Sequence, residues 1–282
     1  MNEKQVEVSL ILCGYNAEET MVKSLDSAMA QTLKSLEILC VNDGSTDKTG
    51  EIFRKYPKKD PRFKVIDHPV NKGLLAARQT GVNQASGKYI MFLDLDDELK
   101  PEACEELSKK MNETGYDILQ FDTNLVFASE EDRKAREKVM ADFFAIKRQE
   151  PLKGSDAILD SCFLKGEFTW NVWSKIYRAE LAKKVYSYVP EKPKVVMAED
   201  TFAFFVAASL AKSLGFVQKK YYFYSVGAGV SGSNNDPKYE ERSVEVYSAL
   251  INPYSVKNST DTGRQVADKL GKHFRFCLAC RL

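Results

Sequence analysis

The sequence lacks features that would place the chain in several other classes of protein. No apolar run approaches the roughly 20 residues of a membrane-spanning helix, and the first residues, MNEKQVEVSL, lack the apolar core of a signal peptide. The 41 basic and 40 acidic side chains leave a net charge of +1, which argues against a general attraction to nucleic acid. We therefore expect a cytoplasmic protein whose partners do not include nucleic acid.

Histidine is almost absent, with only His68 and His273 in 282 residues. The pair Cys277-x-x-Cys280 has no second pair and few imidazoles to complete a closed zinc site, so two positions on one helical face are the better interpretation. A chain of this length can bury a core large enough to fold without disulfides or a structural metal ion.

What the first part of the chain does contain is a regular alternation of short β-branched runs and amphipathic, helix-length segments. This alternation predicts an α/β fold, a mostly parallel sheet flanked by helices. The expected strands span residues 6–13, 36–41, 63–67, 89–93 and, later, 117–127. The expected helices span residues 18–31, 48–55, 74–84 and about 101–111. The charged stretch 129–150 is predicted to be an exposed helix or a mobile excursion.

Four acids lie within five residues directly after an apolar strand, in the segment FLDLDDE: Asp94, Asp96, Asp97 and Glu98. Like charges this close repel one another, and a divalent cation would relieve the repulsion. Mg²⁺ or Mn²⁺ bridging substrate phosphate oxygens suits one or two carboxylates at the end of a strand. The alternative is a solvated acidic loop that caps the following helix.

Two further segments are expected at the same edge of the sheet. In the turn 42–47, Asp43 would stand where a carboxylate can accept hydrogen bonds from a base or a ribose. Lys72 opens the helix 74–84 and Arg78 lies in its second turn, so a phosphate at this helix N-terminus would gain from both cations.

These motifs, in this order and at these spacings, resemble those of the family 2 glycosyltransferases, inverting enzymes of the GT-A fold that use nucleotide-activated sugars. The resemblance covers residues 6–110 and is carried by Val8-Ser9-Leu10-Ile11, Tyr15-Asn16, Asn42-Asp43-Gly44-Ser45-Thr46-Asp47, Asn71-x-Gly73 with Ala77-Arg78, and Phe92-Leu93-Asp94-Leu95-Asp96-Asp97. Less specific matches are Trp170-Asn171, Lys175-Ile176-Tyr177-Arg178 and Glu199-Asp200. The family often has a small polar residue where this chain has Leu95.

The resemblance implies a role for each matched residue. A nucleotide-sugar would contact Tyr15, Asn16, Asp43, Lys72, Arg78, Asp94 and Asp96, with Asp43 at the nucleobase and Mn²⁺ or Mg²⁺ on Asp96 and Asp94. Asp200 would be the catalytic base, with Glu199 in reserve, and Trp170 and Asp97 would contact the acceptor. Two structural alternatives stay open: Glu199-Asp200 as a pair favoured by a helix dipole, and the tryptophans as core residues.

The function expected from this resemblance is transfer of one sugar, with inversion, from a nucleotide-sugar to an acceptor. A UDP-sugar is the favoured donor, and a saccharide or lipid-linked acceptor in surface polysaccharide or glycan synthesis is the expected acceptor. The Gln-x-x-Arg-Trp motif of processive members is absent. Alternatives are a phosphatase of the haloacid dehalogenase type, suggested by Asp94-Leu95-Asp96 after an apolar strand, and a non-catalytic nucleotide- or carbohydrate-binding module.

We expect three regions along the chain: a GT-A half that binds the nucleotide-sugar (1–127), an acceptor-side half of the same domain (128–240) and a helical segment (241–282). Val266, Leu270, Phe274 and Cys277 fall on one helical stripe beside an excess of basic residues. Such a helix would lie on the inner face of the cytoplasmic membrane or on a partner helix, and the alternative is that it docks on its own domain. An oligomer is compatible with this sequence.

Overall fold

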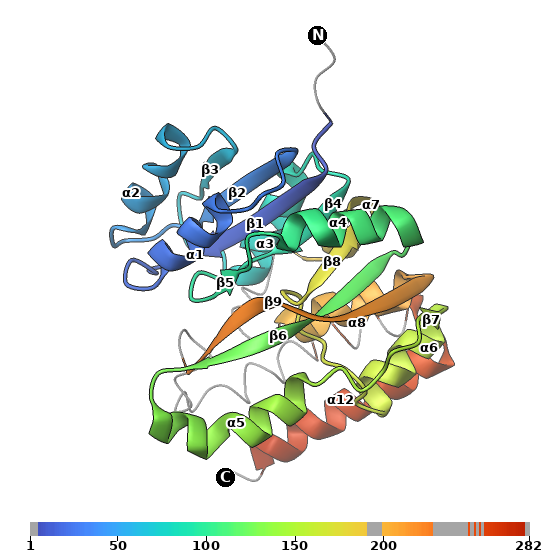
Figure 1. Ribbon diagram of the computed structural model, residues 1–282. Helices are drawn as coiled ribbons and strands as arrows, with labels where there is room; N and C mark the ends of the chain where they lie inside the picture. The colour runs from blue at the N-terminus through green and yellow to red at the C-terminus, as the bar shows by residue number, and fades with distance from the viewer. Residues whose placement is uncertain are drawn as a thin grey trace.

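The computed structural model describes residues 5–190, 199–227, 248, 251, 254 and 257–279, and for 273–279 the backbone alone. Within this part of the chain the strands form one nine-stranded sheet in the order β3-β2-β1-β4-β8-β6-β9-β5, with β7 also paired to β9 (Figure 1). The strands are β1 (Val8–Gly14), β2 (Leu36–Asn42), β3 (Phe63–Asp67), β4 (Tyr89–Phe92), β5 (Glu98–Leu99), β6 (Ile118–Phe127), β7 (Leu152–Lys153), β8 (Lys175–Arg178) and β9 (Ser213–Val226).

The sheet is mixed, although its long ladders are parallel. Strands β3, β2, β1 and β4 run parallel, and β6 pairs with β9 in parallel along its whole length. β8 runs antiparallel between β4 and β6, and the two-residue strands β5 and β7 add antiparallel edges to β9. The predicted α/β class is confirmed. The sequence did not indicate β5 or β7, because two residues show no periodicity.

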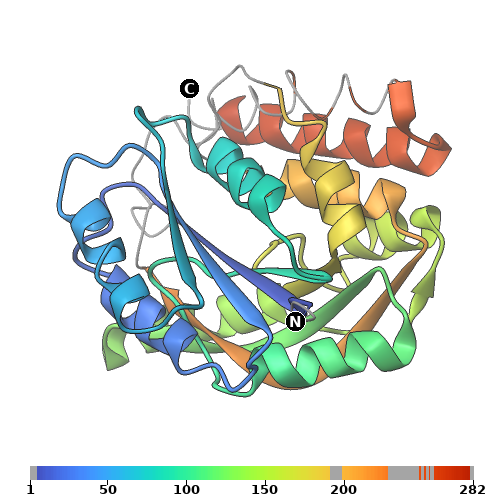
Figure 2. The same cartoon turned by 90° about the horizontal axis from the view of Figure 1, so that it is seen from above.

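Helices cover both faces of this sheet: α1 (Met21–Met29), α2 (Thr49–Phe53), α3 (Leu74–Gln84), α4 (Ala103–Thr114), α5 (Glu130–Phe144), α6 (Ser155–Leu159), α7 (Ala179–Tyr186), α8 (Glu199–Leu210) and α12 (Asp261–Ala279). Seen from above, α1 and α4 lie on one side of the sheet, and α3, α7, α8 and α12 lie on the other (Figure 2). This is the arrangement that alternating strands and helices specify.

The alternation of side chains along β1 divides the core into two clusters. Val8, Leu10 and Leu12 pack with α1 and α4, whereas Ile11 points to the opposite cluster, which contains Leu75 of α3. All five residues are at most 2% exposed. Successive side chains of a strand point to opposite faces, so a buried parallel strand is apolar at almost every position.

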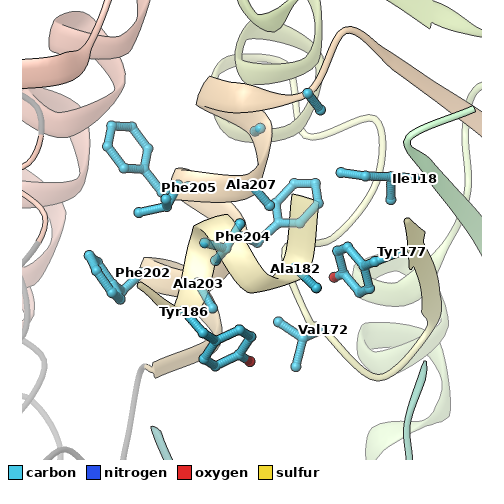
Figure 3. Packing of buried hydrophobic residues seen from close by; sticks show 14 of the residues in the cluster. Ile118, Val172, Tyr177, Ala182, Tyr186, Phe202, Ala203, Phe204, Phe205 and Ala207 are labelled. Carbon is cyan, nitrogen blue, oxygen red and sulfur yellow. The ribbon is translucent and has the colours of Figure 1, made fainter. Parts of the chain in front are cut away.

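Helix α8 is buried around most of its circumference, which fixes its first turn at the edge of the sheet. Phe202, Phe204 and Phe205 are at most 1% exposed and pack among residues of β8 and α7 (Figure 3). Glu199 and Asp200 form the first turn, where the helix dipole favours acidic side chains. The structural interpretation of this acidic pair is therefore correct, and it leaves a catalytic role open.

Some element boundaries differ from those predicted. The helix expected over 18–31 is shorter, Met21–Met29, because the preceding residues form a turn held by the next loop. There the backbone N–H of Glu18 donates to Asp47 Oδ2 at 3.1 Å, and the N–H of Ala17 donates to Thr49 Oγ1 at 2.7 Å. Amphipathic spacing continues through such a turn and cannot mark where the helix begins.

The charged stretch 129–150 forms the exposed helix α5, so a mobile excursion is excluded for its helical part. The Ser129 hydroxyl accepts from the Asp132 N–H at 3.1 Å and caps the helix. Arg133 makes ion pairs with Glu130 and Glu137 along the exposed surface. Only Phe144, the last residue of the helix, is buried.

The described part of the predicted C-terminal stripe faces the protein itself. Val266 and Leu270 of α12 belong to the core cluster around α8. Lys269 Nζ donates to the main-chain carbonyls of Phe163 and Leu164, in the π-helical turn that follows α6. These contacts favour docking on the same domain for this half of the stripe.

The other half of that stripe, Phe274 and Cys277, and the pair Cys277-x-x-Cys280 lie outside the described residues as far as their side chains are concerned. Among the described helices, none combines the length and apolar character that crossing a bilayer requires.

Candidate functional site

The carboxyl ends of β1, β2 and β4 meet at one edge of the sheet, and the loops that follow them line a cavity of about 890 Å³. Of the site residues predicted from the sequence, those lining the cavity are Tyr15, Asn16, Asp43, Arg78, Asp94, Asp96, Asp97, Trp170, Glu199 and Asp200. Lys72 is the exception, because its side chain is exposed and does not line the cavity.

The loop after β1 is tied to the loop after β2. The Asn16 side-chain oxygen accepts from the backbone N–H of Thr46 at 2.9 Å, and the N–H of Asn16 donates to Ser45 Oγ at 3.1 Å. Asn16 has a positive φ of 52°, which asparagine tolerates better than most residues. The neighbouring Tyr15 lies half exposed at the cavity. Asn16 therefore positions this wall as well as facing the cavity.

Asp43 is buried and already holds three hydrogen bonds from the protein. Its Oδ1 accepts from the N–H of Lys72 at 2.9 Å, and its Oδ2 accepts from the N–H of Gly73 at 2.8 Å. His68 Nδ1 lies 2.7 Å from Asp43 Oδ1, and His68 Nε2 lies 2.9 Å from Thr80 Oγ1. The sequence gave no signal for His68, because its contact with Asp43 joins residues 25 positions apart.

Asp94 and Asp96 are close enough for their charges to interact. Burial and the charge of Asp94 raise the pKa of Asp96 to about 6, and burial raises the pKa of Asp94 although Arg78 opposes the shift. Leu95, between them, is buried and fills the space that a Cβ on Gly14 would occupy, since such an atom would lie 2.2 Å from Leu95 Cδ1. The leucine in this motif therefore packs inward and leaves both carboxylates at the cavity.

The protein offers two carboxylates here and not a complete metal cage. Among the described residues, no group of three or more His, Cys, Asp or Glu side chains is arranged to hold a metal ion. Asp96 makes no hydrogen bond with the side chain of another described residue and lines the cavity. This arrangement fits Mg²⁺ or Mn²⁺, which take one or two carboxylates and complete their coordination with substrate phosphates and water.

Arg78 is buried at the centre of three carboxylates. One guanidinium nitrogen donates to Asp94 Oδ1 at 3.0 Å, and the other donates to Glu199 Oε1 at 3.1 Å and to Asp200 Oδ1 at 2.5 Å. Burial alone lowers the pKa of Arg78, but the three carboxylates hold it well above its usual value. Burial and the charge of Asp200 raise the pKa of Glu199 to about 7 against the effect of Arg78. Arg78 thus joins the end of β4 to the first turn of α8.

The turn before β8 supplies a further donor to the same cluster. The N–H of Val172 donates to Asp200 Oδ2 at 3.2 Å. Both tryptophans of this turn line the cavity. Trp170 is half-buried, whereas Trp173 is buried in the core and stacks on Tyr222 and Tyr224 at centroid distances of 4.5 and 5.1 Å. One tryptophan is therefore a core residue, as the structural alternative required.

An aromatic wall that the sequence did not predict comes from the end of α5. The Phe143 ring lies edge-on to Trp170 at 5.6 Å, and the Phe144 ring lies 5.0 Å from that of Tyr224. All four residues line the cavity. The only available signal was the pair of aromatic residues that ends an otherwise charged stretch.

Asp97 is engaged within the protein and is only 1% exposed. Its Oδ2 accepts from the Tyr222 hydroxyl at 2.9 Å and its Oδ1 accepts from the N–H of Ser225 at 2.7 Å. These bonds attach the end of β9 to the acidic loop. They favour a structural role for Asp97 over the predicted contact with an acceptor.

The family profile described as "Glycosyl transferase family 2" matches residues 9–173, more than half of the chain. The chain belongs to glycosyl transferase family 2. The matched range contains Asp43, Arg78, Asp94 and Asp96, and ends before Asp200. The phosphatase alternative is not favoured.

A relative described as a putative glycosyltransferase is similar over most of this chain. The chain is 32% identical to the putative glycosyltransferase EpsH of Bacillus subtilis over 220 residues, which are 78% of this chain and 60% of EpsH. The chain thus spans less than two thirds of the length of that relative.

Solved structures show the same fold. S. aureus TarS in complex with UDP-GlcNAc superposes with a TM-score of 0.70 at 22% identity, covering 95% of this chain and 71% of that one. The mannosyltransferase PcManGT from Pyrobaculum calidifontis, in complex with GDP-Man and Mn²⁺, gives a TM-score of 0.63 at 13% identity, covering 95% of this chain and 70% of that one. The GT-A fold implied by the sequence resemblance is confirmed.

Replacing Arg78 by methionine is expected to lower the free energy of unfolding by about 3–5 kcal/mol. The reason is that three partly buried carboxylates would lose the guanidinium group with which they form ion pairs. The deficit should shrink as the pH falls from about 8 to about 5, since protonation of the carboxyls relieves their repulsion. Urea denaturation measures both effects.

The matched control for this stability prediction is Arg54→Met. The Arg54–Asp67 ion pair is about half exposed on both sides, and such pairs contribute about 0–1 kcal/mol. Equal losses in the two variants would show that the Arg78 cluster does not stabilise the fold.

Proposed function

We propose that the protein is an inverting, non-processive glycosyltransferase that transfers one sugar from a nucleotide-sugar to a saccharide or lipid-linked acceptor in surface polysaccharide or glycan synthesis. The observation that carries the proposal is the Arg78 cluster, in which one guanidinium contacts Asp94 of the acidic strand end and Asp200 of α8. The residues expected at the donor and the expected base are thereby held beside one cavity.

A UDP-sugar is the proposed donor. TarS, which shares the fold, was solved with UDP and with UDP-GlcNAc, and PcManGT was solved with GDP-Man, so this fold accepts nucleotide-sugars of more than one base. In this chain Asp43 would contact the nucleobase or the ribose. His68 and the N–H groups of Lys72 and Gly73 hold its carboxylate in place.

The charge of the cavity supports a metal-dependent reaction. Arg78 is the only basic residue among the described residues that line the cavity, against the acids Glu18, Glu19, Asp43, Asp47, Asp94, Asp96, Asp97, Glu199 and Asp200. A diphosphate would be repelled there unless a cation accompanied it. Mn²⁺ or Mg²⁺ held by Asp96 and Asp94 would neutralise the charge that develops on the leaving diphosphate. PcManGT contains Mn²⁺ with its donor.

Asp200 is the proposed catalytic base. Its carboxylate lines the cavity and is oriented from two sides, by Arg78 and by the N–H of Val172. It would accept the proton of the attacking hydroxyl while the bond to the diphosphate breaks, which inverts the anomeric carbon in one displacement. Glu199 is the alternative candidate for the catalytic base.

The acceptor would lie along the aromatic wall formed by Phe143, Phe144, Trp170 and Tyr224, because aromatic faces stack on the apolar face of a sugar ring. Contact of the C-terminal segment with the inner face of the cytoplasmic membrane stays a prediction. It would bring the enzyme close to a lipid-linked acceptor.

Hydrolysis of nucleotide-sugars tests the function directly. With Mn²⁺ present, we expect slow release of free nucleoside diphosphate from one donor in a panel of UDP-, GDP- and dTDP-sugars. Thermal shift identifies that donor, because a ligand that binds only the native state raises its stability. Release of inorganic phosphate would instead indicate a phosphatase, and binding without turnover would indicate a non-catalytic module.

A further inference from the structure

Lys175, the first residue of β8, is completely buried and forms no ion pair with a carboxylate among the described residues. Its Nζ donates to the main-chain carbonyls of Thr169 at 2.9 Å and Asn171 at 2.5 Å. The same ammonium lies over the Phe204 ring, 4.5 Å from its centroid. Its described contacts are therefore one short turn and one helix.

A buried ammonium group is an unfavourable choice for filling a core. Burial lowers the pKa of Lys175 to about 7 although the charges of Cys162 and Asp200 oppose the shift, so this environment disfavours the charged form. A methionine or leucine would fill a similar volume without that penalty. The lysine is therefore better explained by its hydrogen bonds to the turn than by packing.

The turn that Lys175 binds, residues 169–174, is stiffened by its own polar side chains. Thr169 Oγ1 is bonded to the Asn171 side-chain oxygen, and Asn171 Nδ2 donates to Ser174 Oγ at 2.7 Å. All three residues are at most 7% exposed. Lys175 takes up the carbonyl groups that point inward from this turn.

The turn and the helix that Lys175 contacts are both connected to Asp200. The turn carries the N–H of Val172, which donates to Asp200 Oδ2. Phe204 follows Asp200 by four residues on α8 and so lies on the same face of that helix. Lys175 thus binds the turn that contains Val172 and contacts the helix that carries Asp200.

We propose that Lys175 is a positioning residue for Asp200. Its ammonium group holds the turn 169–174 in place, so that the N–H of Val172 in this turn fixes the orientation of the Asp200 carboxylate. Lys175 does not line the cavity and has no contact with substrate. The inference rests on the proposed function only in so far as Asp200 is the base.

Amide hydrogen exchange of the ligand-free protein tests the positioning without any substrate. In Lys175→Met, we expect exchange at Val172 to accelerate by about tenfold or more, because the turn loses both anchors and opens locally more often. The matched control is Lys269→Met, since Lys269 also donates to two main-chain carbonyls but binds the turn at 163–164. That variant should leave Val172 unchanged.

Unchanged exchange at Val172 in a folded Lys175→Met protein would overturn the proposal. Should that variant fail to fold, Lys175→Gln replaces it. Its amide keeps an N–H donor on a shorter side chain, so it can reach one carbonyl at most, and an intermediate acceleration at Val172 is expected. Wild-type exchange in Lys175→Gln would equally contradict a positioning role.

Kinetics separate positioning from general stability. In donor hydrolysis, Lys175→Met should lower kcat by roughly tenfold with KM for the donor unchanged, because the base is misplaced while the donor residues are intact. The value compared is kcat per folded enzyme, with the folded fraction taken from urea denaturation. A kcat per folded enzyme equal to that of the wild type would indicate a structural role alone. If the wild type hydrolyses no nucleotide-sugar, the proposed function fails, and exchange at Val172 still decides the positioning.

Discussion

Replacing Asp200 by asparagine is expected to lower sugar transfer by ~100-fold or more while donor affinity is retained, the usual scale for a lost general base. The asparagine oxygen can still accept from Arg78, but its amide group then meets the N–H of Val172, so one of two orienting bonds is lost. Steady-state kinetics and calorimetry with the nucleoside diphosphate measure the two quantities.

The companion variant is Glu199→Gln, which changes the neighbouring acid in the same turn of α8. Glu199 contacts the same guanidinium nitrogen as Asp200, at 3.1 Å against 2.5 Å, so both variants change a contact of Arg78. If turnover survives in Asp200→Asn and is lost in Glu199→Gln, the catalytic base is Glu199 and the proposed assignment to Asp200 is wrong.

Replacing Asp96 by alanine should remove the metal-dependent part of nucleoside diphosphate binding and leave the fold intact. The Asp96 carboxylate is held near Asp94 against their mutual repulsion, and a strand-end substitution opens no cavity in the core. Calorimetry with and without Mn²⁺ should therefore give the same affinity in this variant, whereas the wild type gains affinity with the metal.

The control for this effect is Glu98→Ala, in the same run of acids but outside the cavity lining. Glu98 belongs to β5 and pairs with Phe223 of β9. Its removal lowers the negative charge by the same amount, so a metal effect that disappears in both variants would reflect overall charge and not a metal site.

The sequence predicts the parts of the fold that depend on local pattern. Strand β3 and helix α3 agree with their predicted limits, Phe63–Asp67 and Leu74–Gln84. Strands β5 and β7 escaped prediction, and so did the antiparallel position of β8 between β4 and β6. Those features depend on pairing between distant segments.

In the candidate site too, local features could be predicted from the sequence and long-range contacts could not. The acids of the strand-end loop could be predicted because they follow one another along the chain. The grouping of Arg78 with Glu199 and Asp200 joins residues more than 120 positions apart. The contact of Asp43 with His68 and that of Lys175 with the Phe204 ring likewise come from tertiary packing. Residue types thus indicated the chemistry, and the three-dimensional arrangement decides which groups orient it.

The packing of Leu95 against Gly14 restricts which residues can stand at position 14. A side chain at position 14 would collide with the leucine, which is itself buried and has little room to move. A larger residue at the end of β1 therefore requires a smaller one at position 95 of the acidic loop. Among the members of this family, a residue larger than glycine at position 14 is therefore expected only where position 95 carries a side chain smaller than leucine.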